Sequence, residues 1–98
     1  MVKPNLFIEA EAKSELKRIY SYIKKDFLQN AEKVRKEIIA SLGELTNNPG
    51  QYPFDKYRKN NDGSYRAFEI HKYRITYHTT KERITVIRIR HSRDLFEY

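Results

Sequence analysis

The sequence predicts an α+β domain in which a helical hairpin packs on one face of a mostly antiparallel four-stranded sheet. Two observations give the element order strand, helix, helix, strand, strand, strand. Apolar residues recur at helical spacing in two adjacent segments between residues 10 and 45, and from Ser64 onward the period changes to two. A third observation is size: 98 residues, 39% of them hydrophobic, suffice for one core but not for two. Residues 1–98 are therefore expected to form a single domain.

The first strand and the first helix are predicted in the N-terminal third of the chain. In residues 5–9, Leu6 and Ile8 share one face of an extended segment that follows Pro4. A helix is expected from about Ala10 to Leu28, because apolar residues recur there at helical spacing. These residues are Ala12, Leu16, Ile19, Tyr20, Ile23 and Phe27.

A second helix is expected after a short break at Gln29 and Asn30, with Asn30 as its N-cap. Its apolar positions are Ala31, Val34, Ile38, Leu42 and Leu45. It should end before the Asn47-Asn48-Pro49-Gly50 segment, because proline cannot continue the helical hydrogen-bond ladder. Since the break is so short, the two helices must be antiparallel neighbours.

The next two strands are predicted on either side of His71 and Lys72. If these two residues form a two-residue turn, Glu69 lies opposite Arg74 and Phe68 lies opposite Ile75. One face of this strand pair is then apolar and the other is polar. The polar face of the sheet must be solvated or covered by a partner.

The last strand is predicted from Arg83 to His91, and its alternation slips by one residue in the middle. Apolar residues occupy Ile84 and Val86, and then Ile87 and Ile89. A β-bulge near Val86 explains the slip and places Arg88 and Arg90 on the polar face with Arg74. A regular strand would instead place Ile87, Ile89 and His91 there.

The net charge of +7 is distributed unevenly. Residues 1–55 hold nine basic and eight acidic side chains, whereas residues 56–98 hold eleven basic and five acidic ones. A positive field of this kind favours nucleic acid or an acidic protein as the partner, without deciding between them. The plain alternative is a basic surface that only serves solubility.

The composition excludes several kinds of site. Because there is no cysteine, a disulfide scaffold, a thiolate zinc site and a cysteine nucleophile are excluded. The three glycines form no phosphate-binding loop, and the three histidines lie apart from any acidic cluster, so no metal and no cofactor is expected. Apolar runs are far shorter than the roughly 20 residues that span a bilayer, which leads us to expect a soluble cytoplasmic protein without membrane contact.

Two groups of residues are candidates for chemistry or binding. Metal-free RNA cleavage needs a base, cations for the phosphorane and an acid for the leaving oxygen. The candidates are Glu69 or His91 as the base, Arg74 with Arg88 or Arg90 as the cations, and Tyr98 as the acid. A cross-strand ion pair is the simpler interpretation of Glu69 and Arg74, and the stem of Arg66 could equally be structural.

The tyrosines also have two interpretations. Core periodicity explains Tyr20, Tyr22, Tyr73 and Tyr77 through packing. The less constrained Tyr52, Tyr57 and Tyr98 could anchor a protein partner.

Taken together in this order, the segments resemble a known family. The helical hairpin is followed by residues 42–49 (LGELTNNP) and 65–68 (YRAF), and then by the more specific residues 73–77 (YRITY) and 84–94 (ITVIRIRHSRD). From Asn5 to Tyr98 the chain resembles the RelE/ParE superfamily of type II toxin–antitoxin toxins, also called plasmid stabilization proteins.

The resemblance implies a growth-inhibiting bacterial toxin that a small antitoxin neutralises by wrapping it and covering exposed apolar surface. ParE-like members are understood to inhibit DNA gyrase without being nucleases, whereas RelE-like members cleave mRNA in the ribosome. The ending His91-Ser92-Arg93-Asp94 resembles the ParE-like branch, and Arg66 and Phe68 stand where the ribonuclease branch commonly has a lysine pair. We therefore favour the ParE-like branch. The residues expected to bind the target or the antitoxin are Arg88, Arg90, Arg93 and Glu69.

A RelE-like, ribosome-dependent mRNA endoribonuclease is the alternative, because Arg74 matches the arginine that RelE-like enzymes use on the phosphate. Its catalytic residues would be Arg74, Arg66, His91 and Tyr98. A third hypothesis is an inactive remnant that keeps only antitoxin binding. The sequence thus leaves open whether the protein is an enzyme.

Overall fold

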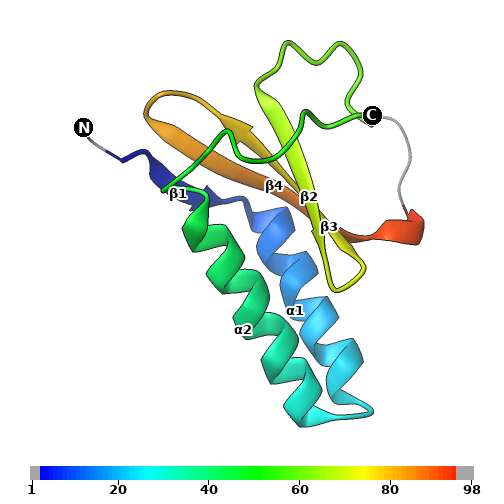
Figure 1. Cartoon of the computed structure of the whole chain (residues 1–98). Coiled ribbons are helices and arrows are strands. Elements are labelled where there is room, and N and C mark those ends of the chain that lie inside the picture. Colours follow the sequence, from blue (N-terminus) through cyan, green and yellow to red (C-terminus); the bar gives the residue numbers. More distant parts are fainter. Residues whose placement is uncertain (1–2, 95–98) are drawn as a thin grey trace.

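A computed structural model describes residues 3–94 of the chain and confirms the predicted α+β architecture (Figure 1). Strand β1 (Asn5–Ile8) is followed by helices α1 (Ala10–Lys24) and α2 (Leu28–Glu44), then by strands β2 (Tyr65–Ile70), β3 (Tyr73–Thr79) and β4 (Arg83–His91), and a short 3-10 turn (Ser92–Asp94). The sheet order is β1-β4-β3-β2; β1 is parallel to β4, and the other two pairs are antiparallel. The two helices lie side by side against one face of the sheet (Figure 1).

The break between the helices comes earlier than predicted. Helix α1 ends at Lys24 rather than near Leu28, and α2 begins at Leu28 with Phe27, not Asn30, at the N-cap position. The Ala31 N–H donates to the Phe27 carbonyl at 3.1 Å, so the helical ladder already starts there. Apolar spacing locates the buried positions of α2 correctly, but its exposed first turn leaves no such signal. Within residues 3–94, neither helix is long and apolar enough to cross a membrane.

The turn between β2 and β3 has the predicted register. Glu69 lies opposite Arg74, and Phe68 lies opposite Ile75. The two turn residues, His71 and Lys72, have φ values of 52° and 69°. Positive φ at both central residues is what the favoured two-residue hairpin turn requires, because its twist matches that of the strands.

The predicted bulge in β4 is also present. Thr76 lies opposite Arg88 and Tyr77 lies opposite Val86, so Ile87 is the extra residue. This residue restores the alternation, and Ile89 points into the core with 1% of its surface exposed. Since Thr76 and Arg74 pair with Arg88 and Arg90, the backbone register places both arginines on the far face, as the bulge predicted, although the Arg88 guanidinium turns back to Glu15 of α1.

The core fills the space between the helices and the near face of the sheet. Its buried members include Ala12 of α1, Val34, Ile38 and Leu42 of α2, and Phe68, Ile75, Tyr77, Ile84, Val86 and Ile89 of the sheet. Leu16, Ile19 and Ile23 pack against this cluster from α1. Tyr22, which periodicity had placed in the core, is instead 67% exposed.

The far face of the sheet is partly covered by residues 45–64, which we call the crossing loop. Its Pro53–Asp55 segment runs beside β2: the Asp55 N–H donates to the Tyr65 carbonyl at 2.9 Å, and the Ala67 N–H donates to the Pro53 carbonyl at 3.2 Å. The Asp55 carboxylate then reaches Arg74 on the far face at 2.9 Å. The chain itself therefore covers part of the face that the sequence had assigned to solvent or a partner.

The Tyr77 hydroxyl anchors the start of the crossing loop to the core and gives a pH-dependent prediction. It donates to the Pro49 carbonyl at 2.9 Å, and burial raises the pKa of Tyr77 to about 12. In the unfolded chain a tyrosine ionises near pH 10, so the folded protein holds this proton more tightly than the unfolded chain does. The resulting contribution of Tyr77 to the free energy of unfolding is fully present below about pH 10 and is lost as the pH rises toward 12.

We therefore expect the free energy of unfolding of the wild type to fall more steeply between about pH 10 and 12 than that of Tyr77→Phe, which has no proton to lose there. At neutral pH the variant should be about 1 kcal/mol less stable, because the Pro49 carbonyl loses its donor. Urea unfolding at several pH values measures both quantities. Parallel stability curves for the two proteins would contradict the prediction.

Candidate functional site

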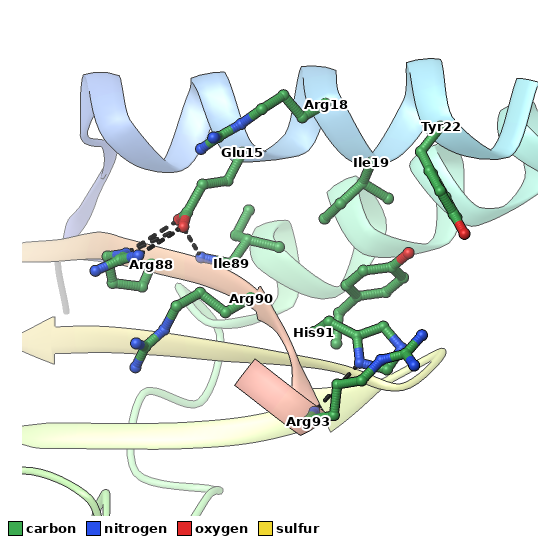
Figure 2. A pocket seen from close by; sticks show the side chains of 10 residues that line it. Glu15, Arg18, Ile19, Tyr22, Arg88, Ile89, Arg90, His91 and Arg93 are labelled. Atoms are coloured by element: carbon green, nitrogen blue, oxygen red, sulfur yellow. Dashed lines mark hydrogen bonds and ion pairs between the residues drawn. The ribbon is translucent and has the colours of Figure 1, made fainter. Parts of the chain in front are cut away.

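The main candidate site is a groove between α1 and the edge of β4 (Figure 2). Strand β1 is only four residues long and pairs with β4 from Arg83 to Val86. From Ile87 onward, the edge of β4 faces α1 instead of another strand. The space left along this edge is a hollow of about 520 Å³, which we call the α1–β4 groove.

Glu15 of α1 occupies one end of the groove and takes the place of a neighbouring strand. Its carboxylate accepts the Ile89 N–H at 2.8 Å and three hydrogen bonds from Arg88 at 2.9, 3.1 and 3.3 Å (Figure 2). The side chain is 7% exposed, so its charge is compensated in a nearly dry position. Periodicity does carry a signal for this role, because Glu15 lies three residues after Ala12 and four before Ile19, on the buried stripe of α1.

The rest of the groove is basic and aromatic. Arg18 and Tyr22 line it from α1, and Arg90 and Arg93 line it from the C-terminal end of the chain. Arg18, Tyr22 and Arg93 are exposed, whereas Arg90 is only 8% exposed. The positive charge that the sequence assigned to the C-terminal half is thus gathered partly along this groove, where it suits an acidic partner.

His91 closes the groove at the end of β4, where its ring holds the 3-10 turn. Its Nδ1 accepts the Arg93 N–H at 3.2 Å (Figure 2). Its ring stands edge-on to Tyr73 with the centroids 5.4 Å apart. Burial raises the pKa of Tyr73, which lines the same groove. Because Nδ1 is an acceptor here, the neutral ring carries its proton on Nε2. The Nδ1 lone pair is already used by the Arg93 N–H, so the arrangement suits a residue that positions Arg93 and does not suit a general base at Nδ1.

Arg74 lies on the far face of the sheet opposite Arg90; it does not line the groove and is held in an ion-pair network. Its guanidinium contacts the Asp55 carboxylate at 2.9 Å and the Glu69 carboxylate at 3.4 Å, the cross-strand pair that the register predicts. The Tyr57 ring lies 4.9 Å from the guanidinium carbon. The side chain is 9% exposed, and its buried Nε has no hydrogen-bond partner among residues 3–94.

Arg66 lies elsewhere again. It pairs with Tyr77 on the near face of the sheet, donates to the Tyr52 carbonyl, and places its guanidinium carbon 4.6 Å from the centre of the Phe54 ring. Of the predicted catalytic residues, Arg66, Arg74 and His91 therefore point into three different surroundings, and Tyr98 lies outside the described residues. In the part of the chain that the structure describes, no common site for RNA cleavage is assembled.

No metal or cofactor site can be assigned from the described side chains. Across residues 3–94, no three histidine, aspartate or glutamate side chains come together in an arrangement that could hold a metal ion. Asp55 and Glu15, the two buried acidic side chains described above, are each paired with an arginine.

Comparisons with known proteins agree with the family resemblance. The sequence profile of the family described as "ParE toxin of type II toxin-antitoxin system, parDE" matches residues 6–96. Among solved structures, the "Chromosomal ParDE TA system from P. aeruginosa" is similar with a TM-score of 0.73 at 16% identity, covering 91% of this chain and 96% of that chain. The YoeB dimer from Staphylococcus aureus is similar with a TM-score of 0.59 at 18% identity, covering 91% and 97%. No curated protein matches the sequence.

Proposed function

The chain belongs to the ParE toxin family of type II toxin–antitoxin systems, and from this premise we propose that it arrests bacterial growth by inhibiting DNA gyrase. The observation that carries the proposal is the family match over residues 6–96, which includes both helices, the sheet from the second residue of β1 onward and the α1–β4 groove. Gyrase would be bound rather than chemically modified. This role suits a basic protein whose polar residues are engaged in ion pairs and hydrogen bonds.

We propose a ParD-type antitoxin as the resident partner, bound in the α1–β4 groove in the cytoplasm, where gyrase works. The chemistry of the groove supports an acidic segment as the ligand, because Arg18 and Arg93 are exposed along it. The Tyr22 and Tyr73 rings offer apolar surface beside these charges, a combination that is common in protein interfaces.

The double variant Arg18→Glu/Arg93→Glu tests this placement of the antitoxin. Reversing two exposed charges should weaken antitoxin binding by about ten- to a hundredfold and should make the remaining binding less sensitive to salt. Isothermal titration calorimetry at two salt concentrations measures both effects. Lys36→Glu, the same kind of change at an exposed position of α2 outside the groove, is the control. Equal losses in both variants would place the antitoxin elsewhere.

The target is tested by inducible expression in a bacterial host. Growth, gyrase-dependent DNA supercoiling and transcript integrity are scored in the same cultures, and purified toxin is added to a gyrase supercoiling assay. We expect growth arrest with lost supercoiling and intact transcripts. Transcripts cut in a ribosome-dependent manner with normal supercoiling would replace gyrase with mRNA as the target. Antitoxin binding without any growth defect would identify an inactive remnant.

A further inference from the structure

The tip of the helical hairpin, residues 22–28, carries large apolar side chains in solvent. Phe27 is 71% exposed, Tyr22 is 67% exposed and Leu28 is 48% exposed. The tip extends beyond the sheet at the far end of both helices (Figure 1). Tyr22 and Phe27 line the same shallow hollow of about 480 Å³. Clusters of exposed apolar side chains that are rimmed by polar or charged residues commonly mark interaction sites.

Phe27 contributes little to the fold at this position. It is the N-cap residue of α2, with φ of −144° and ψ of 111°, and its side chain makes no capping hydrogen bond. Serine, threonine, aspartate and asparagine are preferred there because their oxygens satisfy a free N–H of the first turn. Helix α2 also has no acidic residue in its first turn. Phe27 is therefore neither a residue type preferred at an N-cap nor a buried apolar side chain. Departures of this kind from local sequence rules are expected at functional sites, which indicates a role in binding.

The surroundings of the tip are basic. A second hollow, adjoining the first at Tyr22 and Lys25, is lined by Lys17 and Arg18. Asp26 is the acidic residue in the lining of the first hollow. An aromatic anchor in a basic rim is complementary to an apolar pocket in an acidic protein surface, and tyrosine is enriched among the residues that dominate binding energy.

We infer that the hairpin tip anchors the toxin to its target protein, with Phe27 and Tyr22 entering an apolar pocket that has an acidic rim. The inference rests on the proposed function, in which that protein is gyrase. Tyr22 also lines the α1–β4 groove. An antitoxin segment in the groove therefore contacts one edge of the tip, which gives a steric route to neutralisation.

The variant Phe27→Asp separates binding from folding. Aspartate suits the N-cap, so the melting temperature should stay the same or rise. The concentration that half-inhibits gyrase supercoiling should rise about tenfold or more. Antitoxin affinity should remain within about twofold, because Phe27 does not line the groove. The matched control is Ile39→Asp, which makes the same replacement at a 47% exposed position in the middle of α2 and should leave inhibition unchanged.

Several results would overturn the inference. One is gyrase inhibition by Phe27→Asp equal to that of the wild type. Another is a parallel loss of antitoxin affinity, which would assign the tip to the antitoxin interface. If the wild-type toxin arrests growth but leaves gyrase unaffected, gyrase is not the target. The role of the tip is then tested by comparing the growth arrest caused by the wild type and by Phe27→Asp. In that case, arrest by Phe27→Asp would refute an anchoring role, and loss of arrest with antitoxin binding intact would support it for another target.

Discussion

Replacing Asp55 with alanine is expected to lower the free energy of unfolding by about 3–5 kcal/mol, because the change removes the buried counter-charge of a buried guanidinium. Asp55 is 2% exposed and contacts Arg74 at 2.9 Å. Its carboxylate also accepts the Tyr57 N–H at 3.1 Å, so the substitution loosens the crossing loop as well. A loss of this size is a large part of the 5–15 kcal/mol that typically separates folded and unfolded states.

Two further variants show whether the buried charge is the cause. Glu69→Ala removes the other carboxylate that contacts Arg74, but Glu69 is half exposed, so this control should cost no more than about 1 kcal/mol. The double variant Asp55→Ala/Arg74→Met removes both charges and should recover part of the stability lost in Asp55→Ala. Urea unfolding measures all three proteins. If Asp55→Ala and Glu69→Ala cost the same, the Asp55–Arg74 pair does not hold the crossing loop.

Replacing Glu15 with alanine is expected to cost about 2–4 kcal/mol, because the Ile89 N–H loses its acceptor and Arg88 loses its buried counter-charge. Glu15→Gln should fall between the wild type and Glu15→Ala. Its amide oxygen still accepts the Ile89 N–H, but the amide has no negative charge for Arg88. The expected order of stability is therefore wild type, glutamine variant, alanine variant.

Amide hydrogen exchange at Ile89 distinguishes the two contributions. Exchange should accelerate strongly in Glu15→Ala and only slightly in Glu15→Gln, because only the alanine variant leaves this N–H without a partner. Glu11→Ala is the control, since Glu11 contacts Arg88 at 3.6 Å but is 59% exposed. Unchanged exchange at Ile89 in the alanine variant would mean that Glu15 does not protect the edge of β4.

The features that follow a short-range pattern were predictable from the sequence. The alternation on both sides of His71 fixed the register of the β2–β3 hairpin, because a shift of one residue would turn every side chain to the other face. In the same way, the change of parity between Val86 and Ile89 revealed the bulge at Ile87. Both inferences need only residues that are close together in the chain.

The contacts that build the site were not predictable in this way. Glu15 and Ile89 are 74 positions apart, and Asp55 and Arg74 are 19 positions apart, so no local period links the partners. The crossing loop has no hydrophobic alternation from which its path could be read. Strand parity does separate Arg66 from Arg74, because Arg66 shares the near face with its partner Tyr77 and Arg74 lies on the other face of β3. Residue type alone, on which the ribonuclease hypothesis depends, carries no information about the face.

The pairing of β1 with β4 bears on when the toxin acquires its binding surface during synthesis. Within residues 3–94, strand β1 pairs in the sheet with β4 alone, so the sheet closes only after the 74 residues between Ile8 and Arg83 have been made. One wall of the α1–β4 groove is therefore translated early and the other late. A nascent chain that has not yet reached β4 has no groove, so the antitoxin that we place there must meet a toxin whose synthesis has passed this strand.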